Sequence, residues 1–293
     1  MHAGDIVRLI TLAAIWGGSF IFMRVLAPVL GPVVTADLRV LIAGLALIVY
    51  FRIIRFDPQW RRFWKQYLFI GAVNSALPFF LFSFAALHIP ASYSVIMNST
   101  SPFFAAVFSA IWLHDRLTAK KVIGLLIGAV GVAFVAGIGV AESSPMFNLA
   151  LAACILAAVC YGASATYIKK AGSELTPMGI AGGSQLMAGL LLIPVIPLAP
   201  VRAAITPSVI VGVIVFALLC SAFAYLLYYR LIADLGPTKA LTVTFLMPVF
   251  GMIWGASILN ETITVSMLAG TALILLGTML VLNVRLPGII SPR

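Results

Sequence analysis

The stretch Asn98-Ser99-Thr100-Ser101-Pro102 is a polar run, closed by a proline, inside an apolar segment that extends from Ala91 to Leu113. An uncharged segment of this length is typical of a helix that spans a membrane. Polar side chains at that depth must face other protein or a water-filled cavity. The stretch therefore predicts a membrane protein with a polar interior near Asn98.

The composition of the whole chain supports a membrane protein. The 293 residues are 63% hydrophobic and 9% charged, and the mean hydropathy is +1.16. A soluble domain cannot bury so much apolar surface. The net charge of +10 does not indicate nucleic acid, because Lys and Arg cluster in short connections between apolar runs. The cysteines, Cys154, Cys160 and Cys220, lack metal-ligand spacing and are interpreted as packing residues.

Apolar segments long enough to cross a bilayer follow one another along the chain. The first is too long for the apolar region of a signal peptide, so we interpret it as a span. The connections are short and rich in Pro, Gly or charge, which leaves no room for a soluble domain. We expect an all-α integral membrane protein with ten transmembrane helices, over residues 8–27, 33–53, 67–87, 91–113, 119–138, 149–170, 177–198, 208–231, 237–259 and 265–284.

The basic residues are distributed unequally between the two sides of these spans. All Lys and Arg residues except Arg24, Arg39 and Arg202 fall on the side of the N-terminus. Cytoplasmic loops carry such an excess, so both termini are predicted to be cytoplasmic. The loop from Arg52 to Lys65 contains two tryptophans and is expected to lie along the inner headgroups.

The two halves of the chain repeat the same features. Each half contains five spans, so the second half must enter the membrane from the opposite side. We therefore expect two inverted repeats, residues 1–145 and 146–293, with a substrate site near the midplane where they meet. At an offset of 145, Trp16, Gly17, Ser19, Arg24 and Pro32 match Tyr161, Gly162, Ser164, Lys169 and Pro177, and at 146, Ser75, Pro102, Asp115, Gly124 and Gly131 match Ser221, Pro248, Glu261, Gly270 and Gly277.

These features resemble the drug/metabolite transporter superfamily in its ten-span form with two EamA-type repeats. The residues that carry the resemblance are Trp16-Gly17 with Ser19 and Phe20, Arg39 before an apolar run, Pro102, Asp115-Arg116-Leu117-Thr118, Gly124 with Gly131, and in the second repeat Pro248, Asn260-Glu261-Thr262, Gly270 and Gly277.

Within the superfamily, the chain is most similar to YddG-type exporters of aromatic amino acids from Gram-negative bacteria. The resemblance implies a location in the bacterial inner membrane and a cavity lined by spans 1, 3, 4, 6, 8 and 9. The second repeat departs from the first at Tyr161, which replaces Trp16, and at Ser184, which replaces Arg39. First-repeat roles are therefore not copied onto the second.

Polar residues on the fourth and ninth spans are candidates for substrate binding. Helical spacing places Asn98 and Ser101 on one face of the fourth span, and Thr244 and Met247 on the matching face of the ninth. These groups either bind the charged groups of a ligand or hold helices together.

Pro102 and Pro248 each leave a backbone carbonyl without its helical partner one turn earlier. Such a carbonyl either serves a ligand, allows a bend during transport, or marks a kink with consequences for packing only. We keep both prolines as candidate hinge or gating residues.

Aromatic residues inside the spans are further candidates. Trp16 lies away from the interfaces where tryptophan is usual and shares a stripe with Ser19. Tyr161 and Ser164 occupy the matching positions of the second repeat. The stripe either stacks on an aromatic or apolar substrate or packs in the core.

The third and eighth spans carry polar faces as well. Asn74 and Pro78 share a face of the third span, and Ser221 and Tyr225 share a face of the eighth. Asn74 is costly to bury without a partner, so it is expected either to line a cavity or to bridge helices.

Charged residues near the spans have two interpretations each. Arg39 either extends outward and pairs with Asp37, or contacts the substrate or a gate. Asp115 and Glu261 end spans on opposite sides of the membrane, and helix capping or salt bridging is favoured over substrate binding there.

The chemistry missing from the sequence excludes several functions. There is no paired-carboxylate motif, no HExxH, no nucleophile triad and no P-loop, so we expect no enzyme activity, no cofactor, no metal and no ATP hydrolysis by this chain. The leading hypothesis is a secondary exporter of amino acids, chiefly aromatic ones, that works by alternating access. The alternatives are an exporter of another small metabolite or drug, and an intramembrane enzyme. The expected partners are the substrate and membrane lipid, and the protein is either a monomer or a homodimer.

Overall fold

The computed structural model describes residues 3–137, 144–172, 174–235, 240 and 242–283, and its regular elements there are all helical. The first half contains α1 (Ala3–Leu30), α2 (Pro32–Ile53), α3 (Trp60–Gly71), η1 (Ala72–Ala76), α4 (Leu77–Ala85), α5 (Ala91–Asn98), α6 (Ser101–Trp112) and α7 (Ala119–Ala136). The second half contains α8 (Pro145–Ala171), α9 (Pro177–Leu192), η2 (Ile193–Leu198), α10 (Pro207–Ala217), η3 (Leu218–Phe223), α11 (Ala224–Leu235), α13 (Val243–Leu259) and α14 (Val265–Val281).

These elements combine into ten apolar spans. Eight helical stretches are long and apolar enough to cross a membrane, and the shorter apolar helices α13 and α14 complete the set. The predicted all-α fold with ten spans is confirmed. The beginning of the predicted ninth span, at residues 237–239, lies outside the described residues.

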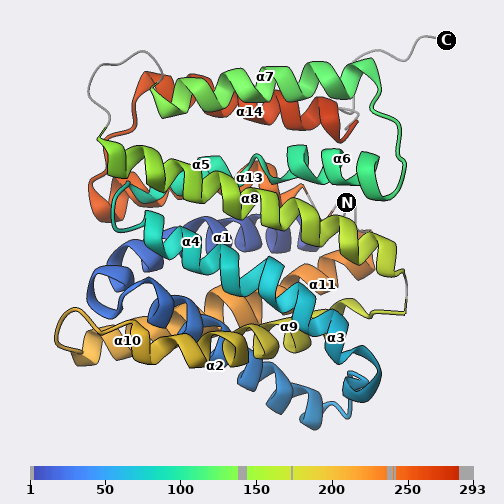
Figure 1. Ribbon diagram of the computed structural model, residues 1–293, viewed down its shortest axis with the longest axis vertical. Helices are drawn as coiled ribbons and strands as arrows, with labels where there is room; N and C mark the ends of the chain where they lie inside the picture. The colour runs from blue at the N-terminus through green and yellow to red at the C-terminus, as the bar shows by residue number, and fades with distance from the viewer. Residues whose placement is uncertain (1–2, 138–143, 173, 236–239, 241, 284–293) are drawn as a thin grey trace.

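Helices from the two halves pack against one another in matching pairs. The first helix of each half packs on the fourth span of the other half, α1 on α13 and α8 on α6, while α2 packs on α9 and α7 on α14. Figure 1 shows α7 and α14 side by side at one edge of the bundle. This exchange of partners is the arrangement expected of two inverted repeats.

Glycines permit the closest of these contacts. A Cβ on Gly17 would lie 2.8 Å from the carbonyl oxygen of Met247, and a Cβ on Gly162 would lie 2.6 Å from the amide nitrogen of Ala105. The α7–α14 pair is equally close, since a Cβ on Gly124 would lie 2.7 Å from the oxygen of Gly277. The glycine faces of α7 and α14 therefore bring these helices together within one chain.

The fourth span is broken at the polar stretch that begins at Asn98. Helix α5 ends at Asn98 and α6 begins at Ser101. Pro102 has no N–H to donate to the carbonyl of Asn98, and the Ser101 hydroxyl donates to that carbonyl instead, at 2.6 Å. In the second half, Pro248 lies inside the continuous helix α13. The matching prolines thus have different structural effects.

Two short π-helical segments, η1 and η3, interrupt the third and eighth spans. They begin at Ala72 and Leu218, 146 positions apart, and each contains a fully buried serine, Ser75 or Ser221. Segments of this kind widen the helix by one residue and are frequent at functional sites. The apolar pattern of the sequence does not predict them.

The two ends of the bundle differ in their charged contacts. At the end where α1 begins, here called the ionic end, Arg8 pairs with Asp234 at 2.7 Å and Lys169 pairs with Asp115 at 2.9 Å. At the opposite or far end, Glu261 accepts hydrogen bonds from the amides that begin α5, including Ala91 N at 2.6 Å. Salt bridging by Asp115 and helix capping by Glu261 are both confirmed.

Candidate substrate site

Aromatic side chains from both halves meet at the centre of the bundle. The Trp16 ring lies 6.0 Å from Tyr225 and 5.3 Å from Tyr228, between ring centroids. Tyr161 stacks on Phe82 with centroids 6.2 Å apart. Phe82 and Tyr228 are 146 positions apart and therefore occupy matching positions in the two halves. Trp16 of α1 thus contacts the second-half residue that corresponds to the first-half residue contacted by Tyr161 of α8.

Arg39 is buried within this aromatic centre, with 4% of its surface exposed. Its Nε donates to Ser221 Oγ at 2.9 Å, and its guanidinium carbon lies 3.7 Å from the ring centre of Phe79 and 4.6 Å from that of Phe216. The alternative in which Arg39 extends outward to pair with Asp37 is not observed. Two residues apart on a helix, these side chains point to different faces of α2.

Tyr225 connects the arginine to two amides. It lies within electrostatic reach of Arg39, as does Tyr161, and next to the side chains of Asn74 and Gln185. The group formed by Trp16, Arg39, Asn74, Tyr161, Gln185, Ser221 and Tyr225 is called the central cluster below. It joins both π-helical segments to helices of both halves.

Several polar atoms around the central cluster are buried without a hydrogen bond of normal geometry to any described residue. They include both polar atoms of the Gln185 amide, Ser75 Oγ, Ser164 Oγ and Arg39 Nη1, and at the break in the fourth span Asn98 Oδ1. Buried polar groups are normally satisfied, so such a concentration is typical of a site that receives a polar ligand or water.

Other candidate residues have different surroundings. The Ser19 hydroxyl donates to the Trp16 carbonyl within its own helix at 2.6 Å, and the Ser101 hydroxyl is engaged at the α5–α6 break. Met247 is buried in the apolar core. Pro78 is buried directly after η1, one turn beyond Asn74, and its missing N–H favours the irregular backbone there. Thr244 lies in the first turn of α13.

Gln185 was not predicted from the sequence. At the offset of 145, Arg39 matches Ser184, whereas Gln185 lies 146 positions from Arg39. Gln185 is fully buried and carries the only amide in the predicted span 177–198. Since an amide in hydrocarbon needs a partner, its presence there was a usable signal.

A cavity of about 430 Å³ lies at the far end and is lined by charged and apolar side chains. Arg24 and Glu261 both line it, and Arg24 donates a hydrogen bond to the carbonyl of Ala86. Lys169 matches Arg24 in the repeat, and Asp115 matches Glu261. Unlike Arg24 and Glu261, these two residues form an ion pair, which lies at the ionic end. The bundle is thus joined by an ion pair at one end and hollowed at the other.

The family of the chain follows from a comparison with family models. The model of the EamA-like transporter family matches residues 5–137 and 148–283. The chain belongs to this family. It is therefore a multi-pass membrane transporter, and membership of this family argues against enzyme activity. As an EamA-like protein it takes a small-molecule substrate.

Alignments with several related proteins cover most of this EamA-like chain. It is 25% identical to the transporter YvbV of Bacillus subtilis, over 92% of this chain and 88% of that protein. It is 23% identical to the protein PecM of Dickeya dadantii, over 93% and 90%. It is 29% identical to the threonine/homoserine exporter RhtA of Escherichia coli K12, over 88% and 84%.

A solved crystal structure has the same fold. It superposes with a TM-score of 0.66 at 16% sequence identity and covers 96% of both chains. At this identity the likeness concerns the fold alone.

Proposed function

We propose that this EamA-like protein exports amino acids, aromatic ones foremost, across the bacterial inner membrane by alternating access. The observation that carries the proposal is the central cluster, in which aromatic rings and unsatisfied polar atoms meet between the repeats. The similarity to RhtA, an exporter of threonine and homoserine, supports amino acids as the substrate class.

The chemistry of the central cluster and of the adjoining residues Tyr228 and Ser164 suits a zwitterion. Trp16, Tyr225 and Tyr228 offer rings against which an aromatic side chain can pack. Amides and hydroxyls are available for the charged groups of an amino acid, as at Gln185 and Ser164. Asn98, Ser101, Thr244 and Met247, on the fourth span of each repeat, are proposed to line the path on either side of the cluster.

The difference between the two ends supports alternating access. Ion pairs join helices at the ionic end, whereas a cavity opens between Arg24 and Glu261 at the far end. In the proposed orientation both termini and the ionic end face the cytoplasm. We further propose that the repeats divide near residue 145 and that each moves as a unit around the central cluster.

Transport by the purified protein in liposomes tests this function. Labelled phenylalanine or tryptophan is expected to cross the membrane, and Trp16→Ala is expected to raise the concentration for half-maximal flux by roughly tenfold, because a stacking surface is lost. Asn98→Ala is expected to reduce flux as well. The matched control is Trp64→Ala, since Trp64 is exposed near the start of α3.

The outcome separates the substrate classes. Flux of amino acids that falls in Trp16→Ala and not in Trp64→Ala supports the proposal. Absence of flux for every amino acid, in a protein that remains folded, rejects it in favour of another small metabolite or drug.

A further inference from the structure

Arg39 is a cation buried inside the bundle without an acidic partner among the described residues. It forms no ion pair with a described Asp or Glu residue. Its electrostatic neighbours are Tyr161, Cys220 and Tyr225, side chains that are uncharged at neutral pH. A buried, unpaired charge is costly in a membrane protein and typically marks a ligand pathway.

The described contacts of Arg39 leave one terminal nitrogen of its guanidinium without a partner. Phe79 and Phe216 contact it through their rings, and Ser221 accepts a hydrogen bond from Nε. Ring contacts compensate part of the buried charge. Nη1 is buried and makes no hydrogen bond to a described residue. The guanidinium therefore retains a donor at Nη1 that suits a carboxylate, the group with which arginine forms its strongest hydrogen bonds.

Gln185 provides a second polar group beside Tyr225, and its hydrogen bonding is incomplete. It has no exposed surface, and neither its Oε1 nor its Nε2 has a hydrogen bond of normal geometry. Tyr225 lies within reach of both Gln185 and Arg39. The two halves thus contribute matching polar residues, a cation from α2 and an amide from α9, to one side of the central cluster.

We propose that Arg39 binds the carboxylate of the transported substrate and that Gln185 completes this carboxylate subsite. The inference rests on the proposed amino-acid transport and assigns Arg39 a binding role in place of a gating one. A ligand ammonium is disfavoured beside Arg39 because like charges repel. A substrate with a carboxylate and an aromatic side chain would then span from Arg39 to the ring of Trp16.

Competition between an acid and its amide tests the carboxylate subsite. L-phenylalanine and L-phenylalaninamide differ only in the group that Arg39 would bind, and each is titrated against uptake of labelled L-phenylalanine. Wild-type protein is expected to prefer the acid. In Arg39→Gln the inhibition constant of the acid is expected to rise at least about tenfold, since a charge-assisted hydrogen bond is lost, with little change for the amide.

Arg62→Gln is the matched control. Arg62 lies in the first turn of α3, is exposed and pairs with Glu174, outside the central cluster and the far-end cavity. This variant is expected to retain the preference for the acid. An unchanged preference in Arg39→Gln, or an equal loss in Arg62→Gln, overturns the assignment.

A binding measurement keeps the inference separate from the proposed function. Benzoate is added to the purified protein in detergent while its melting temperature is recorded, with benzamide as the uncharged comparison. A rise with benzoate in wild type and not in Arg39→Gln supports the carboxylate subsite even if no amino acid is transported. The same response in both proteins, or none in wild type, rejects it.

Discussion

Gly17 shows how a single residue without a side chain positions the central cluster. It follows Trp16 directly and lies where α1 contacts α13, with Met247 O and Gly251 N both within 3 Å of where a Cβ would be. Only glycine permits this approach, because backbone atoms cannot move aside as a flexible side chain can. The approach fixes the rotation of α1 and so directs Trp16 toward Tyr225 and Tyr228.

Gly17→Ala is therefore expected to destabilise the protein. The added methyl group overlaps backbone atoms of α13, and overpacking of this kind costs about 1–3 kcal/mol. Thermal unfolding in detergent measures the loss. Gly4→Ala is the control, since a Cβ there meets nothing within 4 Å, and an equal effect of both substitutions would contradict the packing explanation.

The sequence predicted part of the central cluster at the level of residues. Trp16, Asn74, Tyr161 and Tyr225 were found because polar or aromatic groups far from the interfaces stand out in apolar spans. The contacts of Arg39 were not predicted. They depend on Phe79 and Phe216, apolar residues whose meeting is decided by helix packing and leaves no signal in the local pattern.

At the scale of elements, the break between α5 and α6 depends on Pro102. Replacing Pro102 by alanine restores an N–H that can bond the Asn98 carbonyl, which the Ser101 hydroxyl now occupies. Pro102→Ala is expected to join α5 and α6 into a straighter helix, with an equal or higher melting temperature and at least about threefold slower flux. Pro248→Ala is the comparison, because α13 is already continuous. A larger loss in Pro248→Ala would contradict this role for the break.

The ion pair between Lys169 and Asp115 joins α8 to the connection between α6 and α7. The hydrogen bond and charge of Lys169 lower the pKa of Asp115 below its ordinary value of 3.8. A lowered pKa in the folded state means that the pair stabilises the protein above that ordinary value and that its contribution disappears as the pH falls through the lower folded value.

We expect the melting temperature of wild type to fall slightly more than that of Asp115→Asn as the pH decreases from about 5 to about 2. The effect is small because both side chains are exposed to solvent. Parallel melting curves for the two proteins over this range would show that the pair contributes nothing.

The sequence predicted the number and approximate limits of the spans but not their internal irregularities. Hydrophobic length decides whether a segment crosses a bilayer, and that is visible in composition. The π-helical segments η1 and η3 depend on a shift of single backbone hydrogen bonds, which leaves the apolar pattern unchanged. Pro78 explains part of η1, but no proline follows η3 at the matching position, Ala224.

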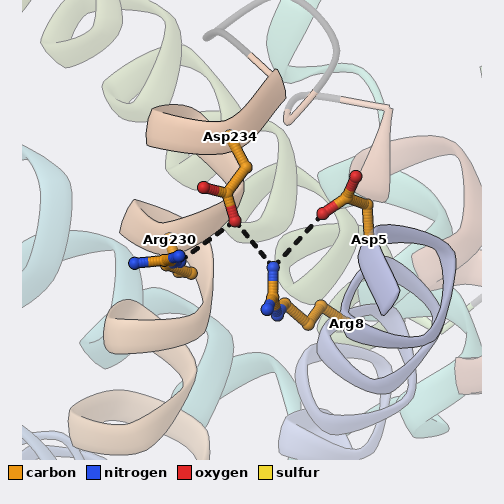
Figure 2. Close-up of polar contacts among 4 residues, drawn as sticks. All are labelled: Asp5, Arg8, Arg230 and Asp234. Atoms are coloured by element: carbon orange, nitrogen blue, oxygen red, sulfur yellow. Dashed lines mark hydrogen bonds and ion pairs between the residues drawn. The ribbon is translucent and has the colours of Figure 1, made fainter. Parts of the chain in front are cut away.

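At the scale of the whole molecule, the ionic end is held together by a small network between α1 and α11. Figure 2 shows Arg8 between Asp5 and Asp234, while Arg230 approaches the same Asp234 oxygen. Two arginines therefore share one carboxylate, and Asp234 links the beginning of α1 to the end of α11. Both helices carry aromatic residues of the centre, Trp16 and Tyr225.

Asp234→Asn is expected to loosen the ionic end, because it removes the carboxylate that both arginines contact. Cys220 is buried beside Ser221 and serves as a reporter once Cys154 and Cys160 are replaced by alanine. The labelling rate of Cys220 by a water-soluble thiol reagent is expected to rise severalfold in Asp234→Asn.

Glu174→Gln is the matched control for this labelling. It removes the ion pair with Arg62, whose side chains are 58% and 63% exposed, against 36% and 27% for Arg8 and Asp234. The more exposed pair is expected to contribute less. Equal labelling rates in wild type and Asp234→Asn would show that the network does not restrict access to the centre.

The inverted repeat and the charge asymmetry were readable from the sequence because both arise from features that recur in order. The contrast between the ion pairs at the ionic end and the cavity at the far end was not. Under the proposed alternating access, one sequence encodes several conformations of nearly equal energy. Which end carries the cavity would then depend on the conformation and not on the pattern of residues.

The exchange of partners between the halves also constrains how the chain can be made. During synthesis α1 emerges first, yet the helix on which it packs, α13, is translated more than 200 residues later. Until then the glycine face of α1 can meet only lipid or earlier helices. Neither half made alone can form these contacts, so the two halves expressed as separate polypeptides should be unstable singly and recover a folded protein only when produced together.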